Sequence, residues 1–114
     1  MIKSYNEKNV EIKNMRGGKG ECKIVNHINP EELPHGRLFS TITIDSGNSI
    51  GSHEHHNEVE YYLILSGQGV VTESSGEHIV KEGDVVITGW GEGHAIRNDE
   101  AEPLVFLALI LFTD

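Results

Sequence analysis

Regularly spaced turn signals constrain the fold of this chain more than any other feature of its sequence. From residue 45 onwards, clusters rich in glycine, serine, asparagine and aspartate recur at 45–48, 56–57, 66–69, 74–76, 81–84, 89–93 and 98–103. The intervals between them hold apolar, aromatic and β-branched residues in runs of about five to eight, the usual length of a strand. No segment keeps a helical period over several turns. The sequence therefore predicts an all-β sandwich or barrel.

The chain before these turns divides into a polar arm, a loop and two further strands. Residues 1–20 are polar and end in a glycine-rich run, so we expect an arm and a loop outside the core. Residues 21–28 alternate weakly as a strand, residues 29–36 form a loop with two prolines, and residues 37–44 form a second strand. A chain of 114 residues can close one hydrophobic core. We expect one barrel domain over residues 21–114.

Composition and charge exclude several classes of function. The 9 basic residues against 18 acidic residues give a net charge of −9, which provides no basic surface for nucleic acid or anionic lipid. The single Cys22 cannot form an internal disulfide, the N-terminus has no apolar signal region, and the longest apolar run, 104–112, is too short to span a bilayer. We expect a soluble cytoplasmic protein whose partner is a small molecule, with neither nucleic acid nor membrane.

The last predicted strand, residues 104–111, is apolar on both parities. Both of its faces should therefore be covered. The barrel interior can cover one face, and either a second subunit or the N-terminal arm can cover the other, because large exposed apolar patches are uncommon on monomers. We expect a homodimer formed through its strands and the arm.

The stretch 47–67 brings together the side chains best suited to chemistry. His53 and His55 are two residues apart, so both imidazoles point to the same face of an extended chain. A short turn follows, and the next run is aromatic and β-branched, as in a strand. If that strand pairs beside the first, Glu58 or Glu60 can meet the two histidines. Nitrogen and carboxylate ligands in a β structure suit a divalent transition metal.

The spacing in this stretch resembles the first signature motif of the cupin family. Its positions, in the pattern G-x5-H-x-H-x4-E-x6-G, are Gly47, His53, His55, Glu60 and Gly67. The positions that resemble the second motif, with glycine where the family usually has proline, are Gly83, Gly89, Gly91, His94 and Asn98. The resemblance implies a double-stranded β-helix of jelly-roll type, for which we expect six to eight strands. It also implies that the metal ligands are His53, His55, Glu60 and His94.

Such a ligand set implies one divalent metal ion per chain. Three imidazoles and one carboxylate take four positions of an octahedral ion and leave two open. Manganese, iron, nickel, cobalt and zinc all accept these ligands. The two open positions suit a bidentate carboxylate, keto acid or enediol, or else one organic ligand together with O₂.

Further side chains are candidates for the surroundings of this metal. The count to Gly67 favours Glu60 over Glu58 as the ligand, which leaves Glu58 as the one candidate for a catalytic acid or base. Tyr62 shares the parity of Glu60 and is expected to line the pocket. Phe39 and Arg37 are further candidates for the substrate pocket, although for Arg37 the sequence favours a pair with one of the 18 acidic residues.

The chain also resembles small single-domain bacterial cupins that are commonly labelled oxalate decarboxylases. True oxalate decarboxylases are bicupins with an arginine three residues before the first ligand histidine, and here that place is taken by Ile50. We therefore expect binding of a small oxygen-rich ligand without efficient oxalate decarboxylation. The protein is either a metal-dependent lyase, isomerase or dioxygenase, or a non-catalytic module that binds or senses a small ligand or metal.

Overall fold

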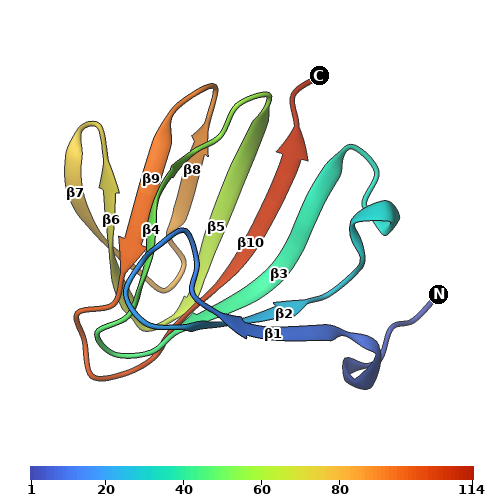
Figure 1. Ribbon diagram of the computed structural model, residues 1–114, viewed down its shortest axis with the longest axis horizontal. Helices are drawn as coiled ribbons and strands as arrows, with labels where there is room; N and C mark the ends of the chain where they lie inside the picture. The colour runs from blue at the N-terminus through green and yellow to red at the C-terminus, as the bar shows by residue number, and fades with distance from the viewer.

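Alternating short strands and tight turns fold into two antiparallel sheets in the computed structural model, which describes residues 1–114 (Figure 1). The strands are β1 (Asn9–Lys13), β2 (Cys22–Asn26), β3 (Gly36–Ile44), β4 (Ser49–Glu54), β5 (Glu58–Ser66), β6 (Gln68–Glu73), β7 (Gly76–Lys81), β8 (Val85–Gly89), β9 (Gly93–Arg97) and β10 (Leu104–Phe112). The helical segments are two short 3-10 turns, η1 (Tyr5–Glu7) and η2 (Pro30–Glu32). The predicted all-β fold of jelly-roll type is confirmed, with ten strands instead of six to eight.

The larger sheet has the strand order β1-β2-β3-β10-β5-β8, and the smaller sheet has the order β4-β9-β6-β7. Apolar residues of both sheets pack into one core cluster, to which the larger sheet contributes Ile42 and Ile64 and the smaller sheet Ile50 and Ile96. The two sheets therefore enclose a single interior between them.

β10 lies at the centre of the larger sheet, between β3 and β5. Its alternate residues Leu104, Phe106, Ala108 and Ile110 are buried in the interior. The residues between them face outwards and are only partly covered. One face of this apolar strand therefore forms the core, as predicted, and the other belongs to the outer surface of the sheet.

The N-terminal segment, expected as an arm and loop, contains the additional strand β1. β1 pairs with β2 in antiparallel register, so it forms an edge of the larger sheet. Val10 and Ile12 of β1 are exposed. β1 is held in the sheet by backbone hydrogen bonds and buries neither of its faces. Its sequence therefore needs no alternation of apolar and polar residues, which explains why the strand was not predicted.

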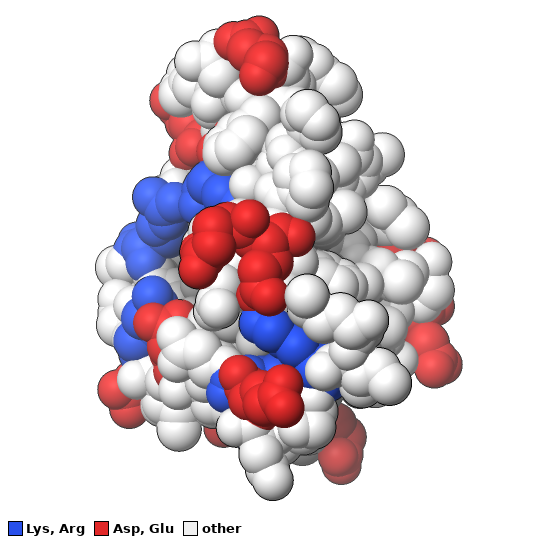
Figure 2. Space-filling model, turned by 90° about the vertical axis from the view of Figure 1, so that its right-hand side faces the viewer, with Lys and Arg blue, Asp and Glu red and all other residues white.

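Acidic and basic side chains are interspersed on the face drawn in Figure 2, where Lys and Arg lie beside Asp and Glu. As for membranes, the helical segments of the structure all lack the length and apolar character that a bilayer crossing requires.

Candidate metal centre

His53 lies near the end of β4 and reaches the interior through a change in strand register. β4 pairs with β9, and the register shifts between Ile50 and His53, so that His53 lies directly opposite His94. The Nδ1 atom of His53 is 2.8 Å from the carbonyl oxygen of Gly51. A carbonyl can only accept a hydrogen bond, so Nδ1 carries the proton and the lone pair is on Nε2. That lone pair faces the other ligand candidates.

His55 follows β4 and is held by the turn before β9. Its amide donates to the carbonyl of Glu92 at 3.0 Å, and its carbonyl accepts from the amide of Gly91 at 2.8 Å. Its side chain is buried, and Nδ1 donates to the Oε2 atom of Glu58 at 2.5 Å. His55 therefore also directs the free lone pair of Nε2 into the interior.

Glu60 and His94 complete the cluster from two different sheets. Glu60 lies on β5, and its Oε1 atom is 3.0 Å from Nε2 of His94 and 3.0 Å from Nε2 of His55. The imidazole of His94 stacks on the ring of Tyr62, with centroids 4.9 Å apart and planes inclined by 15°. The pairing of β4 with β9, together with the packing of β5 against them, converts two distant sequence motifs into one site.

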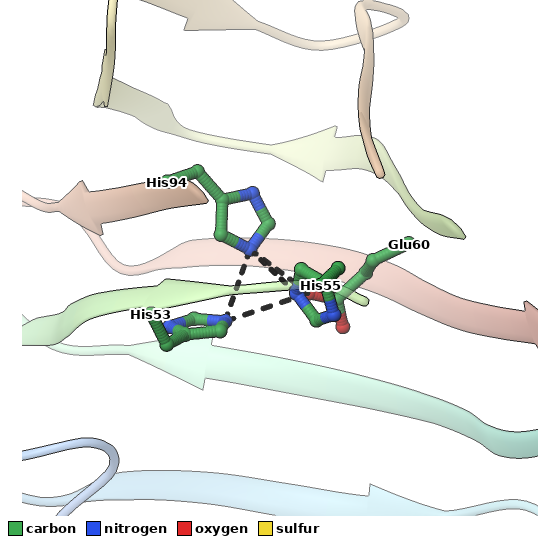
Figure 3. Close-up of side chains that lie close together, drawn as sticks. All are labelled: His53, His55, Glu60 and His94. Atoms are coloured by element: carbon green, nitrogen blue, oxygen red, sulfur yellow. Dashed lines mark hydrogen bonds and ion pairs between the residues drawn. The ribbon is translucent and has the colours of Figure 1, made fainter. Parts of the chain in front are cut away.

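The separations between the four donor atoms fit a common metal ion (Figure 3). One ligand atom from each residue lies within 4.8 Å of all the others. Nε2 of His94 is 3.0 Å from Nε2 of His53 and 3.2 Å from Nε2 of His55. Donors bound at about 2.1 Å and at right angles to each other are about 3.0 Å apart. The cluster thus has both the chemistry and the dimensions of a divalent metal site.

Opposing effects set the pKa values inside this cluster. Burial raises the pKa of Glu60, but the hydrogen bonds that His53, His55 and His94 donate when their Nε2 atoms are protonated outweigh it and hold the pKa far below the ordinary value. Burial lowers the pKa of His94. Burial also tends to lower the pKa of His55, but hydrogen bonds to Glu60 and Glu58 raise it above the ordinary value. A metal ion must therefore compete with a proton for His55, so metal affinity falls as the pH falls.

Glu58 bonds to Nδ1 of His55, on the side of the imidazole that faces away from the other ligand candidates. The guanidinium of Arg37 donates to Glu58 from Nε and from a terminal nitrogen, both at 2.8 Å. These bonds from Arg37, with a smaller contribution from His55, lower the pKa of Glu58 to about 2. A carboxyl group that is ionised at neutral pH cannot act as a proton donor. In this arrangement Glu58 orients His55, and its role as a catalytic acid or base stays a prediction.

A cavity of about 370 Å³ is lined by three of the four ligand candidates, His53, His55 and Glu60. Tyr62 and Arg37 also line it, and their contact with a substrate stays a prediction. Arg37 reaches it because the register of β3 against β10 shifts beside Leu38, and such a bulge redirects the adjacent side chain. Phe39 is outside this cavity. It lies on the opposite face of β3 and packs against His27, with ring centroids 5.2 Å apart.

The sequence analysis missed part of the cavity wall. Met15 and Arg16, from the loop that joins β1 to β2, line the cavity together with the ligand candidates. The only local signal was the group of glycines at 17, 18 and 20, which indicates a loop without saying what the loop packs against.

Comparisons with known proteins agree on one family. The model of a family described as Cupin domain matches residues 40–110. An oxalate-binding protein of Thermotoga maritima is 42% identical over 102 residues, which cover 88% of this chain and 84% of the relative. The crystal structure of a protein from the same organism, described as a predicted oxalate decarboxylase, matches with a TM-score of 0.91 at 38% identity, over 98% of this chain and 99% of that one. The polyketide cyclase RemF from Streptomyces resistomycificus, 16% identical with a TM-score of 0.78 over 100% of this chain and 81% of its own, shares the fold alone.

Proposed function

Because this chain belongs to the cupin family, we propose that it binds one divalent metal ion per chain and a small dicarboxylate of the oxalate class on that ion. The metal ligands in this proposal are His53, His55, Glu60 and His94. The observation that carries it is the convergence of four donor atoms within 4.8 Å of one another beside a cavity. A bound ion of manganese, iron, nickel, cobalt or zinc would supply positive charge and two open coordination positions to a bidentate oxyanion.

The identity of the ligand class rests on the cavity and on one relative. The relative with 42% identity is named an oxalate-binding protein, and it covers most of both chains. The cavity walls beside the ligands include the apolar side chains of Ile42, Ile50 and Leu38. Such walls exclude water around a bound anion and strengthen its attraction to a metal ion.

We favour binding over efficient decarboxylation of oxalate. Decarboxylation needs a proton donor that replaces the departing carbon dioxide. Glu58 is ionised by its pair with Arg37 and does not line the cavity. The place of the arginine in oxalate decarboxylases is taken by Ile50, which is buried in the core. A metal-dependent lyase, isomerase or dioxygenase activity on another substrate is the alternative.

The metal part of the proposal is tested by metal content after single alanine substitutions. Replacing His53, His55, Glu60 or His94 should each lower the bound metal well below one ion per chain, as measured by plasma mass spectrometry. His78→Ala is the matched control, because His78 is an exposed histidine of β7 that bonds only to Ser75 in the side-chain network. Undiminished metal content in a double variant at His53 and His94 would end the proposal.

The ligand part is tested with protein loaded with Mn²⁺. Calorimetric titration should detect oxalate binding with one site per chain. Incubation with oxalate, with and without oxygen, should release formate and carbon dioxide far more slowly than the rate of about 10 per second that is typical of enzymes. Formate production near that rate would establish a decarboxylase instead.

We further propose that the protein forms a homodimer through the outer face of its larger sheet. β1 extends the edge of that sheet and leaves the outward face of β10 uncovered by an arm. Next to β10, the outward residues Leu63 and Leu65 of β5 are exposed. So are Val85 and Ile87 of β8, the edge strand beyond β5. A second copy of the chain would remove this apolar surface from water.

A further inference from the structure

A single cation without a partner lies in the cavity wall. Arg16 lines the same cavity as His53, His55 and Glu60. Its side chain is exposed and takes part in no hydrogen bond or ion pair, whereas the other cavity cations are both paired. Lys13 lies 3.4 Å from Glu11, which also lines the cavity.

The backbone of Arg16 is held against β4, two strand positions from a metal ligand. The amide of Gly51 donates to the carbonyl of Met15 at 3.1 Å. A Cβ atom on Gly51 would lie only 2.1 Å from the carbonyl oxygen of Arg16, and a Cβ atom on Gly18 would lie 2.2 Å from the carbonyl oxygen of Ser49. The loop and strand β4 can approach this closely only because residues 18 and 51 are both glycine. Figure 1 shows this loop between β1 and β2 crossing β4.

Further hydrogen bonds fix the same loop. The side-chain amide of Asn14 donates to the carbonyl oxygens of Gly18 at 2.6 Å and Gly20 at 3.0 Å. The amide of Lys19 donates to the Ser49 hydroxyl at 2.8 Å, and the amide of Ser49 donates to the Lys19 carbonyl at 2.9 Å. The position from which the Arg16 side chain extends is therefore set by the fold.

The sum of the charges in the cavity suggests what the Arg16 guanidinium binds. A divalent ion and the Glu60 carboxylate together carry one positive charge, and a dicarboxylate dianion changes that sum to one negative charge. Arg37 is already neutralised by its two bonds to Glu58. The charge of Arg16 brings the sum to zero. Uncompensated charge in a partly enclosed site is costly, so the balance favours a dianion over a monoanion.

We propose that Arg16 is the specificity-determining residue of the cavity. Its guanidinium pairs with the carboxylate oxygens that point away from the metal, and the site therefore selects dicarboxylates over monocarboxylates with the same chelating atoms. The planar, bidentate geometry of a guanidinium matches a carboxylate edge. Ile50 cannot supply this contact, and the N-terminal loop supplies it instead. This inference rests on the proposed function.

The test compares two ligands that differ in one group. Oxalate and pyruvate both offer a carboxylate next to a second oxygen, but pyruvate has a methyl group in place of one oxyanion. Both are titrated calorimetrically into protein loaded with Mn²⁺, as wild type and as Arg16→Gln. Because a hydrogen bond to a charged group contributes about 1.5–3 kcal/mol, Arg16→Gln should weaken oxalate binding about 10- to 100-fold. Pyruvate binding should change by a smaller factor than oxalate binding, since pyruvate keeps only one of the two oxygens that point away from the metal.

Two further variants separate pairing from general charge effects. Lys19→Gln removes the same charge from the same loop, but Lys19 does not line the cavity, so oxalate affinity should stay close to wild type. Arg16→Lys keeps the charge without the planar fork and should give an intermediate oxalate affinity. Metal content, measured in parallel, should remain one ion per chain in all variants.

The outcomes distinguish this inference from the function on which it rests. If wild type binds metal but no oxalate, both the proposed ligand class and the role of Arg16 are overturned. If wild type binds oxalate and Arg16→Gln binds it equally well, only the inference about Arg16 fails. It fails too if Lys19→Gln loses as much affinity as Arg16→Gln, or if Arg16→Gln loses its metal.

Discussion

Glu58 lies between a cation and a candidate metal ligand, with Arg37 on one side and His55 on the other. In this position the carboxylate fixes which nitrogen of His55 carries the proton and increases the basicity of the other nitrogen. Arg37 keeps the carboxylate ionised and fixed in orientation. Hydrogen bonds from Arg37 to Glu58 and from His55 to Glu58 therefore hold the candidate ligand in place.

Glu58→Gln should lower metal affinity by about 10- to 100-fold, because the neutral amide supports the His55 imidazole less strongly. Competition with a calibrated chelator measures the effect. The matched control is Glu54→Gln. Glu54 also bonds to a histidine, His56, at 2.9 Å, but this pair is exposed and outside the ligand cluster. Equal losses in the two variants would contradict an orienting role for Glu58.

Cys22 is buried in the core, and burial, reinforced by the charge of Asp45, raises the pKa of its thiol to about 11. Only the thiolate reacts with disulfide reagents. A raised pKa leaves less thiolate at a given pH, so at pH 8 the native protein should react about 100-fold more slowly than a thiol of ordinary pKa. The rate should increase about tenfold for each pH unit up to pH 10. Native labelling as fast as labelling in guanidinium chloride at the same pH would refute this.

At the scale of elements, the loop between β1 and β2 and the strand β4 form one unit. They are far apart in sequence, yet their backbones are hydrogen-bonded, and the loop forms a wall of the cavity beside the candidate metal ligands. Any change that separates them should affect both stability and ligand binding. The candidate metal ligands lie on β4, β5 and β9 and, for His55, directly after β4.

Gly51→Ala tests this coupling. Its new Cβ atom would lie 2.1 Å from the carbonyl oxygen of Arg16, so the loop must move or the strand must distort. Overpacking of this kind costs about 1–3 kcal/mol, which a urea denaturation curve measures. Oxalate affinity should fall as well, because Arg16 moves with the loop. Ser52→Ala, at the next and exposed position, should leave both quantities close to wild type. An unchanged urea midpoint for Gly51→Ala would rule out the close packing.

At the scale of the whole molecule, the outer face of the larger sheet carries several exposed apolar side chains on neighbouring strands. The exposed fractions of Leu63, Leu65, Val85 and Ile87 are 37%, 40%, 56% and 51%. Leu63 lies directly opposite Val85 on the neighbouring strand, so these side chains form a continuous patch on β5 and β8. Such a patch is a surface on which a second subunit can bind.

Light scattering should therefore give a mass of twice 12.6 kDa at micromolar concentration. Ile87→Glu should shift the mass towards the monomer, because a charge in an apolar interface loses its hydration. Ile79→Glu is the control, since Ile79 is equally apolar and 62% exposed but lies on β7 of the other sheet. A wild-type mass of 12.6 kDa would exclude the dimer.

The sequence by itself determined the features that depend on local chemistry. Turn residues at short intervals predict the strands, and the two-residue spacing of His53 and His55 places both imidazoles on one face. The spacing to Glu60 and His94 identifies the remaining candidate ligands through the resemblance to cupins. These patterns are readable because turn conformation and side-chain alternation are properties of neighbouring residues.

Only the tertiary structure decided what each side chain meets. β1 pairs through its backbone, which leaves no side-chain pattern in the sequence. A register shift directs Arg37 into the cavity, while normal alternation keeps Phe39 out of it. The bonds of Glu58 to both Arg37 and His55 depend on how the strands pack. Arg16 lines the cavity because its loop packs against β4, a strand far away in sequence. Contacts between residues far apart in the chain depend on the packing of whole sheets, which no local pattern encodes.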